Sequence, residues 1–411
     1  MTPTSQLHQT VECATATLAP TVREFAAGLP SEALPAYIYD LGALRTHVTA
    51  IRAALPSEVE LYYAAKANPD AAVLEALRDA VDGYEVSSAG ELAHVRQVAP
   101  GAPLAFGGPG KTPAEIAAAV SAGVYRWHLE SVQELYQLAS ALSSTPDQQV
   151  DVLLRVNVPV AEGSLESVAL AMGGRPSPFG LDPADVARAL ELLAGPIGRQ
   201  LRLRGIHAHL GSGLSAAEHL AVAEQIVNWS AALAARHGLR FDEVNIGGGM
   251  AVDYADPSAR FDWVEFGTGL RTLLDHRPEL RLRIEPGRAL TAYCGYYATE
   301  VLDVKVSQGE PFAVVRGGTH HLRTPATKGH SQPFAVVPVE EWSHPWPRSE
   351  AAGPVSLTGQ LCTPKDLLAQ GIPVPVIRSG DRVVFAMAGA YAWNISHHEF
   401  LMHPRPGFHY I

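Results

Sequence analysis

Cysteine and lysine are the scarcest reactive side chains in this chain of 411 residues. A disulfide framework and a four-cysteine zinc site are both excluded, because the cysteines are few and far apart: Cys13, Cys294 and Cys362. Of the 31 basic residues only five are lysines, namely Lys66, Lys111, Lys305, Lys328 and Lys365. Codon bias accounts for this scarcity, but chemistry that needs a lysine amine has only these five candidates.

Positive charge and long apolar runs are also limited. The formal net charge is −11, which argues against a general binder of nucleic acid or of an anionic membrane. No uncharged apolar run approaches the roughly 20 residues of a membrane-spanning helix. The first basic residue is Arg23, so the start lacks the charged region of a signal peptide. We therefore expect a cytoplasmic enzyme that binds neither nucleic acid nor membrane.

A repeating pattern of short apolar runs and Ala- and Leu-rich helical stretches begins near residue 60. The predicted strands are Glu60–Ala65, Tyr84–Ser87, Leu104–Gly107, Tyr125–Leu129, Val150–Val158, Leu203–Leu210, Glu243–Gly247 and Arg281–Glu285. The predicted helices between them are Ala71–Ala80, Glu91–Val98, Pro113–Ala122, Val132–Leu142, Pro183–Leu193, Ala216–His237 and Trp263–His276. Eight such units indicate an α/β fold, a (β/α)8 TIM barrel, with a doubly wound sheet as the alternative.

After Arg288 the pattern changes to short β-type runs that Gly and Pro interrupt. These runs are Val301–Val306, Phe312–Val315, Phe334–Val339, Val374–Val376 and Val383–Ala386. They predict a separate C-terminal β domain of sandwich-like or barrel-like type. We expect an N-terminal arm at 1–40 that contributes to the β domain through Ala36–Tyr39, a barrel at 41–290 and the β domain at 291–411.

Residues that carry chemistry gather at the predicted carboxyl ends of the barrel strands, where catalytic residues of this fold lie. Lys66 ends an apolar strand, and desolvation there would lower its pKa and free the amine for a Schiff base. Gly247, Gly248 and Gly249 follow the seventh strand and would let backbone N–H groups approach an anion closely. With Arg288 they occupy the common phosphate position of the fold. An exposed lysine and an ordinary glycine turn are the structural alternatives.

Two further groups belong to the same predicted rim. Glu285 ends the eighth strand and would either pair with Arg288 alone or hold a protonated ring nitrogen. His207 and His209 share a strand face because their spacing is two; they would be metal ligands, a structural pair, or a ring stacked on a cofactor. An amine, a phosphate cradle, a carboxylate and a flat ring together suit pyridoxal phosphate.

These segments, in order from about Pro35 to Pro406, resemble the alanine-racemase-type (fold type III) pyridoxal-phosphate decarboxylases, the group of diaminopimelate and ornithine decarboxylases. Each motif is modest alone, but their common order is specific. The motifs that carry the resemblance are Tyr62–Asn68, Phe106–Lys111, His128–Ser131, His209–Ser212, Gly247–Gly249, Glu285–Arg288, Gly359–Cys362 and Gly389–Tyr391.

The resemblance implies a role for each of these segments. Lys66 would hold the cofactor until the substrate amine displaces it, and His209 would stack on the ring. Glu285 would keep the ring nitrogen protonated, and since a racemase of this fold has arginine there, Glu285 favours decarboxylation. Cys362 of the other subunit would protonate the carbanion carbon, which implies a head-to-tail homodimer with shared active sites. The implied cofactor-binding residues are Ser212, Gly247, Gly248, Gly249, Gly287, Arg288 and Tyr391.

Departures from the family pattern bear on the substrate. Thr363 replaces an acid that follows the catalytic cysteine in relatives, and Pro178 replaces a lysine of the diaminopimelate decarboxylases. We expect Arg323, Thr363 and His320 to contact the substrate, although His320 and the adjacent His321 fit simple loop residues equally well. An anionic or bulky distal group is favoured over the ammonium of ornithine or lysine. The resemblance extends to decarboxylases of siderophore assembly, so a citryl-amino acid is the leading expectation and meso-diaminopimelate is the alternative.

Two other classes of protein are compatible with parts of the sequence. A metal-dependent barrel hydrolase would use His207, His209 and Glu285, but no His-x-His motif marks the first strand. A non-catalytic pyridoxal-phosphate carrier resembles the barrel alone, and the β domain with Cys362 argues against it.

Overall fold

The structure is a computed structural model that describes residues 16–159, 170–171 and 173–411. The chain divides into two compact units. One unit, the barrel unit, comprises Leu41–Val252 and Ala259–Thr291. The other, the β unit, comprises Asp253–Ser258, Ala292–Ile411 and the described part of Met1–Asp40. None of the helices described is long and apolar enough to cross a membrane.

Eight parallel strands close into a barrel, which confirms the predicted barrel fold and excludes the doubly wound sheet. The order around the barrel is β10, β11, β2, β3, β4, β5, β6 and β8. Their bounds are β2 (Val59–Ala64), β3 (Gly83–Val86), β4 (Leu104–Phe106), β5 (Arg126–Leu129), β6 (Val150–Arg155), β8 (Leu201–His207), β10 (Glu243–Asn245) and β11 (Arg281–Ile284).

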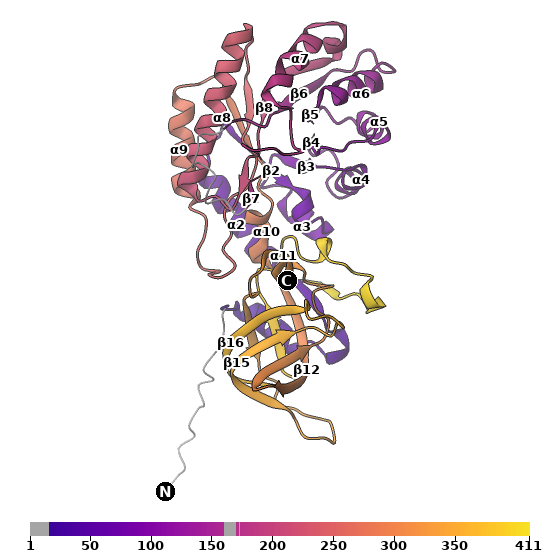
Figure 1. The fold of residues 1–411 in the computed structure, drawn as a ribbon, viewed down its shortest axis with the longest axis vertical. Helices are drawn as coiled ribbons and strands as arrows, with labels where there is room; N and C mark the ends of the chain where they lie inside the picture. The colour runs from indigo at the N-terminus through magenta and orange to yellow at the C-terminus, as the bar shows by residue number, and fades with distance from the viewer. Residues whose placement is uncertain (1–15, 160–169, 172) are drawn as a thin grey trace. The chain divides into compact units, whose positions relative to one another are not determined.

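Helices surround the strands of the barrel (Figure 1). They are α2 (Leu41–Ala54), α3 (Ala71–Leu77), α4 (Ala89–Val98), α5 (Pro113–Ser121), α6 (Val132–Leu142), α7 (Pro183–Ala194), α8 (Ala216–His237), α9 (Trp263–Asp275) and α10 (Arg288–Thr291), with 3₁₀ turns η2 (Ala65–Ala67) and η3 (Pro196–Gln200). Thr112 with Glu115 and Ser215 with Glu218 form capping boxes that start α5 and α8. Each box satisfies backbone N–H groups that the first helical turn leaves open.

Two predicted strands end earlier than their apolar runs suggest. β6 stops at Arg155 and β8 at His207, where the two strands are still paired with each other. After β8 the chain continues into the short β9 (Gly211–Ser212), which pairs with β7 (Leu170–Ala171). The strand expected to carry both His207 and His209 therefore carries only His207.

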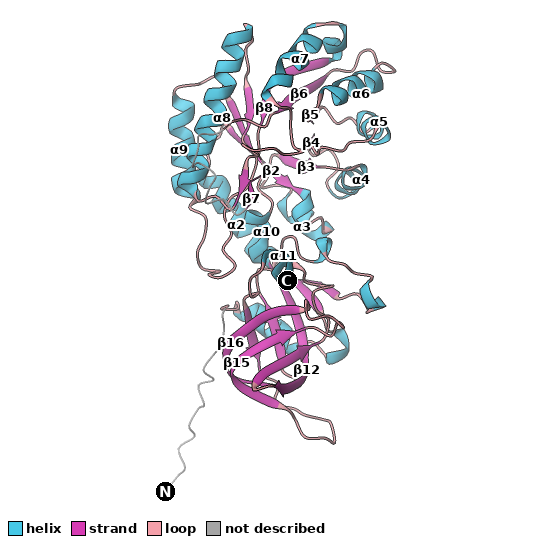
Figure 2. Cartoon of the chain, in the orientation of Figure 1, coloured by secondary structure: helices cyan, strands magenta, loops and turns pink. Residues whose placement is uncertain are grey.

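The β unit is built on an eight-stranded sheet in which most neighbours are antiparallel (Figure 2), as expected of a separate β domain. Its strands are β1 (Ala36–Tyr39), β12 (Gly295–Ser307), β13 (Glu310–Val315), β14 (Phe334–Val337), β15 (Glu350–Thr358), β16 (Leu367–Arg378), β17 (Arg382–Phe385) and β18 (Gly407–Tyr410). Its short helices are α1 (Pro20–Gly28), α11 (Thr324–Lys328), η1 (Ser31–Ala33), η4 (Ala292–Cys294), η5 (Trp393–Ile395) and η6 (Phe400–Met402). Val22 and Ala26 of α1 pack with Ile38 and Val384 in an apolar core.

Some strands of the β unit were missed or predicted only in part: β15 was not predicted, and the predicted run Val374–Val376 covers only a part of β16. Gly353 and Pro354 interrupt β15, and Gly371 and Pro373 interrupt β16, so neither strand shows an alternating pattern. The two strands pair along a register with several bulges, which accommodate these residues. Pairing with a neighbour, rather than local side-chain periodicity, creates these strands.

The segment Asp253–Ser258 follows β10 in sequence but groups with the β unit. Tyr254 in this segment lies against His330, with ring centroids 4.6 Å apart. The ammonium of Lys328 lies 5.7 Å from the centre of the Tyr254 ring. The predicted domain boundaries leave this segment in the barrel, because its sequence has no periodic pattern that would assign it to the β unit.

Candidate functional site

The carboxyl ends of the barrel strands are joined by backbone hydrogen bonds. The amide of Glu285 donates to the carbonyl of Gly247 over 2.8 Å, which links the ends of β11 and β10. The amide of Ala64 donates to the carbonyl of Pro286 over 3.3 Å, which links β2 to the same point. The segments that carry Lys66, the three glycines and Glu285 therefore meet on one rim, as the sequence predicted.

Lys66 lies in η2, directly after β2. Its Nζ is 2.5 Å from Oε2 of Glu85, a buried carboxylate on β3. Burial opposes the charge of Glu85, but the Lys66 charge and hydrogen bonds from Lys66 and Ser87 outweigh it and hold the pKa of Glu85 below its usual value. The Lys66 side chain is 47% exposed, so the desolvation expected from the sequence is only partial. The amine is thus held by an ion pair and accessible to a ligand.

The three glycines after β10 turn tightly against His209. The amide of Gly248 donates to Nδ1 of His209 over 3.0 Å. Gly247 and Gly249 have φ of 72° and 97°, a backbone region that favours glycine. A Cβ on Gly247 would lie 2.5 Å from the His209 ring, and one on Gly249 would lie 2.1 Å from the carbonyl oxygen of Gly211. Only glycine fits this turn, whose bare backbone suits an anion.

The His209 ring is neutral at physiological pH. Burial, followed by the positive charges of Arg155 and Lys66, lowers the pKa of His209 to about 3. Since Nδ1 accepts the hydrogen bond from Gly248, the remaining ring proton belongs on Nε2. A neutral, flat ring fixed beside the glycine turn is suited to lie against another planar group.

Glu285 is buried at the end of β11. Asn245, the last residue of β10, donates a hydrogen bond to its Oε1 over 2.7 Å. Nε2 of His128 lies 3.6 Å from the same oxygen, and Nε2 of His207 lies 3.7 Å from Oε2. The carboxyl group is therefore surrounded by nitrogen atoms of three strands.

The protonation of Glu285 is balanced near neutral pH. Burial and the negative charge of Glu85 raise the pKa of Glu285 to about 7, against the opposing effects of Arg283, Lys66 and the Asn245 hydrogen bond. A carboxyl group with such a pKa responds to a cation or an N–H group placed beside it.

Two buried ion pairs support the rim. Arg155 lies 2.5 Å from Glu130, whose second oxygen accepts a hydrogen bond from the amide of Gly180 over 2.9 Å. Lys111 lies 2.6 Å from Glu134 and also donates to the carbonyl oxygen of His128 over 2.9 Å. These pairs fix the ends of β5 and β6 against the loops that follow them.

Sequence reasoning missed Glu85, Asn245 and Glu130 as site residues. The available signal was a charged or amide side chain inside or directly after an apolar strand, as at Glu85 in the run Tyr84–Ser87. That signal does not distinguish a residue that faces the barrel interior from one that faces outward.

A metal centre was the alternative use of the rim histidines. Within the described part of the chain, His128, His207 and Glu285 offer ligand atoms that lie within 4.8 Å of one another, and His209 is not in the group. Burial and four positive charges lower the pKa of His128 well below its usual value; the charges belong to Arg283, Lys111, Arg155 and Lys66. Each of these four cations is itself paired with a carboxylate, so their charges do not exclude a divalent cation.

Cys362 is an exposed free thiol in the β unit, whereas Cys294 is buried and Cys13 lies outside the described residues. The loop that carries Cys362 is fixed by Asp366. This carboxylate accepts hydrogen bonds from the amide of Thr319 over 2.6 Å and from the amide of Leu361 over 2.8 Å. The thiol is therefore presented on a backbone that is held in place.

Tyr391, the residue expected from the resemblance to reach the cofactor phosphate, also lies in the β unit. Its φ is 49°, in the left-handed region that non-glycine residues rarely adopt. The hydroxyl of Thr324 on α11 donates to its carbonyl oxygen over 2.7 Å, which helps to hold this backbone.

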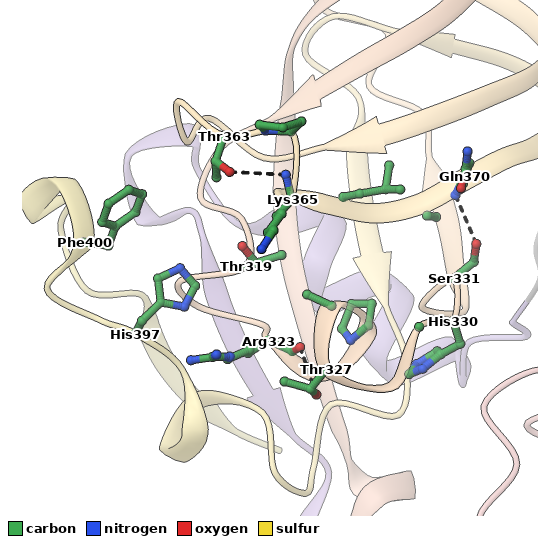
Figure 3. Close-up of a pocket in the computed structure, with 16 residues that line it drawn as sticks. Thr319, Arg323, Thr327, His330, Ser331, Thr363, Lys365, Gln370, His397 and Phe400 are labelled. Atoms are coloured by element: carbon green, nitrogen blue, oxygen red, sulfur yellow. Dashed lines mark hydrogen bonds between the residues drawn. The ribbon is translucent and has the colours of Figure 1, made fainter. Parts of the chain in front are cut away.

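A pocket of about 770 Å³ lies in the β unit, and Arg323 and Thr363 both line it, as do Lys365 and His397 (Figure 3). No Asp or Glu is among the described residues that line it. Within the described residues, no carboxylate lies within ion-pair distance of Arg323 or Lys365. Burial and the charge of Arg323 lower the pKa of His397. The pocket therefore presents unpaired positive charge.

His320 does not line this pocket. Its side chain is fully buried, with its ring centroid 4.0 Å from that of His321 and 5.1 Å from that of His403. Burial and the neighbouring histidines lower the pKa of His320 to about 4. The sequence grouped His320 with Arg323 because they are close in the chain, but the structure turns the His320 ring into the unit.

The barrel rim fits pyridoxal phosphate. This cofactor needs a lysine amine, an acidic partner for its ring nitrogen and a backbone cradle for its phosphate. The rim offers the accessible amine of Lys66, the buried carboxyl of Glu285 and a glycine turn whose space a Cβ would fill.

Comparison with known proteins supports the same cofactor. Residues 41–292 match the pyridoxal binding domain of the pyridoxal-dependent decarboxylases. The chain is 38% identical over 380 residues to the 2-[(L-alanin-3-ylcarbamoyl)methyl]-2-hydroxybutanedioate decarboxylase of Staphylococcus aureus (strain NCTC 8325 / PS 47). The aligned residues cover 91% of this chain and 93% of the relative. It is 34% identical over 366 residues to a diaminopimelate decarboxylase of Actinosynnema pretiosum subsp. auranticum. This alignment covers 87% of this chain and 79% of that relative.

The fold agrees with a solved structure as well. A variant of the diaminopimelate decarboxylase of Helicobacter pylori, crystallised with L-lysine, superimposes with a TM-score of 0.81 at 21% identity, over 95% of this chain and 94% of that one. None of these matches is a hydrolase, so the metal-dependent alternative has no support. The chain belongs to the pyridoxal-dependent decarboxylases and is a pyridoxal-phosphate-dependent carboxy-lyase.

Proposed function

We propose that this enzyme removes the α-carboxylate of an amino acid that is joined to a citrate-derived polycarboxylate, a step of siderophore assembly. The Staphylococcus aureus relative acts, by its name, on an amino acid linked through an amide to a hydroxylated dicarboxylate. The observation that carries the proposal is the β-unit pocket, where Arg323 and Lys365 lie without an acidic partner among the described residues. Such a pocket suits the carboxylates at the far end of this substrate.

Decarboxylation of meso-diaminopimelate is the second candidate, and the Actinosynnema pretiosum relative favours it. The far end of diaminopimelate carries an ammonium as well as a carboxylate. A pocket lined by two cations and by no described Asp or Glu repels that ammonium. We therefore expect diaminopimelate to bind less well than the citrate conjugate.

The barrel residues have separate tasks in this proposal. Bound pyridoxal phosphate supplies the electron sink for the pair that remains when CO2 departs. Lys66 would provide the amine that holds the cofactor, Glu285 would keep a proton on the ring nitrogen, and the flat ring of His209 would offer a surface for the cofactor ring. Of the barrel rim, Ser212, Gly247, Gly248, Gly249, Gly287 and Arg288 would hold the phosphate, and the family resemblance adds Tyr391. The glycine turn and the poised carboxyl support these roles.

We expect the Gly249→Ala substitution to weaken cofactor binding by about tenfold or more and to lower the melting temperature. The added methyl group meets a backbone oxygen that cannot rotate away, and the positive φ costs a further ~1–2 kcal/mol. Titration of the apoprotein with pyridoxal phosphate and a thermal melt measure the two effects.

Gly238→Ala is the matched control for that substitution. Gly238 ends α8 with φ of 63°, and a Cβ there meets nothing within 4 Å. This variant should lose some stability and keep the wild-type affinity for the cofactor. Unchanged affinity in Gly249→Ala would contradict the proposed phosphate cradle.

We further propose that Cys362 acts from the partner subunit of a homodimer and donates the proton that replaces CO2 at the reacting carbon. Its exposure on a fixed loop supports this role. The next residue, Thr363, lines the cationic pocket, so one loop carries the proton donor beside the pocket for the far end of the substrate.

Turnover of a substrate panel tests the proposed function. The holoenzyme is given an amino acid conjugated to citrate, meso-diaminopimelate, ornithine or arginine, and CO2 release is followed. The conjugate should have the highest kcat/KM. A preference for diaminopimelate would replace the first candidate by the second, and a preference for ornithine would contradict both, because the pocket offers no described acid to an ammonium.

Removing a pocket cation should weaken substrate binding more than it slows chemistry. Lys365→Ala and Arg323→Ala are each expected to raise KM for the conjugate about tenfold with little change in kcat, the effect of losing one hydrogen bond to a charged group. Lys328→Ala is the control, since Lys328 lies on α11 but does not line the pocket. Unchanged KM in both pocket variants would show that the pocket does not bind substrate.

A further inference from the structure

His207 is buried, and neither the proposed cofactor contacts nor the proposed substrate pocket includes it. It is the last residue of β8, and its side chain is 6% exposed. Within the part of the chain that is described, neither of its ring nitrogens has a hydrogen-bond partner. Leaving both polar atoms of a buried ring unpaired is costly, so a partner is expected in the working enzyme.

The acceptor placed to become that partner is Glu285. Nε2 of His207 is 3.7 Å from Oε2 of Glu285, and a movement of about 0.8 Å would bring the two atoms to a usual hydrogen-bond length. The other oxygen of Glu285 already accepts a hydrogen bond from Asn245 over 2.7 Å. One oxygen of the carboxyl group is thus held, and the second lies next to His207.

The His207 ring can donate without carrying charge. Burial and the nearby His128, Arg155, His209 and Lys66 lower the pKa of His207 well below its usual value, so the ring is neutral and carries one N–H. The ring of His128 packs against it, with centroids 4.2 Å apart.

We propose that His207 is a positioning residue that donates a hydrogen bond from Nε2 to Oε2 of Glu285 and so holds Glu285 in the charged form that pairs with the cofactor ring nitrogen. The inference rests on the proposed role of Glu285 at that nitrogen. The titratable and charged groups around Glu285 are Lys66 after β2, Glu85 on β3, His128 on β5, His207 on β8 and Arg283 on β11. The negative charge of Glu85 disfavours the charged form of Glu285. A second N–H donor, in addition to Asn245, would stabilise that charged form.

Two substitutions of the full-length enzyme separate the donor from the ring. His207→Phe keeps a flat ring and removes the N–H, whereas His207→Gln removes the ring and keeps an N–H donor. Each cofactor-free protein is titrated with pyridoxal phosphate between about pH 6.5 and pH 9, a range that spans the pKa of Glu285. The dissociation constant is measured at each pH, and a thermal melt is recorded.

We expect His207→Phe to bind the cofactor about tenfold more weakly near pH 7. Loss of the donor raises the pKa of Glu285 further, so less of it is charged at pH 7, and the defect should shrink toward pH 9, where Glu285 ionises without help. His207→Gln should stay within about threefold of wild type at every pH. Should His207→Phe fail to fold, His207→Met, which also lacks the donor, takes its place.

The opposite order of the two variants would overturn the proposal, because a packing role tolerates Phe and not Gln. Equal binding by wild type and both variants would overturn it as well. Tight binding of zinc ion to the cofactor-free protein, lost in His207→Phe, would assign His207 to a metal instead. Wild-type protein that binds no pyridoxal phosphate would contradict the proposed function itself, which keeps the two failures distinct.

Discussion

Lys66→Ala is expected to carry no cofactor after borohydride reduction and to release CO2 about 10³-fold more slowly than wild type, the scale on which removal of a catalytic group acts. Lys66 places an accessible amine on the barrel rim, and its charge is matched by Glu85. Peptide mapping of the reduced wild-type holoenzyme should find the cofactor-derived mass on the peptide that contains Lys66. A CO2-release assay with the preferred substrate measures the loss of rate.

Two controls separate the amine from its charge. Lys66→Arg retains a cation beside Glu85 but offers a guanidinium, which is a poor nucleophile, so it should fold with near wild-type stability and still be inactive. Lys305→Ala removes an exposed lysine of β12 and should leave both readouts unchanged. Cofactor found on a peptide other than the one with Lys66 would refute the assignment.

Cys362→Ala is expected to bind pyridoxal phosphate as wild type does while the rate of product formation falls about 10²- to 10⁴-fold, the usual contribution of a positioned proton donor. The reacting carbon must gain one proton for each CO2 lost, and the substitution removes the group proposed to deliver it. The absorbance spectrum of the holoenzyme reports the bound cofactor, and chromatography of the amine product reports correct protonation. A fully active variant would exclude Cys362 from this step.

Mixing the two inactive variants tests whether the site is shared between subunits. In a heterodimer of Lys66→Ala and Cys362→Ala, one site combines the intact Lys66 of one chain with the intact Cys362 of the other. After subunit exchange, about one quarter of the wild-type activity should return, since half of the dimers are mixed and each has one complete site. If no activity returns although subunits exchange, both residues act within one chain.

Much of the barrel site was predictable because the motifs lie at strand ends. Lys66, Gly247 and Glu285 each fall within two residues of the end of a strand in the structure. Once eight parallel strands are recognised, topology alone brings such residues to one rim. The glycine turn was readable for a related reason, since three glycines in a row indicate backbone that approaches something closely.

The partners of these residues could not be predicted in the same way. Glu85 lies inside a strand, and the register of β2 with β3, which sets Ala64 opposite Glu85, decides that its side chain meets Lys66. Lys365 and Arg323 line the same pocket because the loop before β16 lies beside α11. No pattern in the sequence near either residue indicates that these two segments are neighbours. For His320 the same limit applies: it is close to Arg323 in sequence, but its ring is buried within the β unit and does not line the pocket.

The pairing of β1 constrains how the chain is made. Ala36 pairs with Gly407 and Tyr39 with Tyr410, so β1, the first described strand of the β unit, waits for β18, the last described strand of the same sheet. While the barrel is being translated, β1 has neither β12 nor β18 beside it, and a free strand edge invites pairing with other chains. Chains that stop short of Gly407 would leave β1 paired with β12 alone and expose the edge of β1 that β18 otherwise covers.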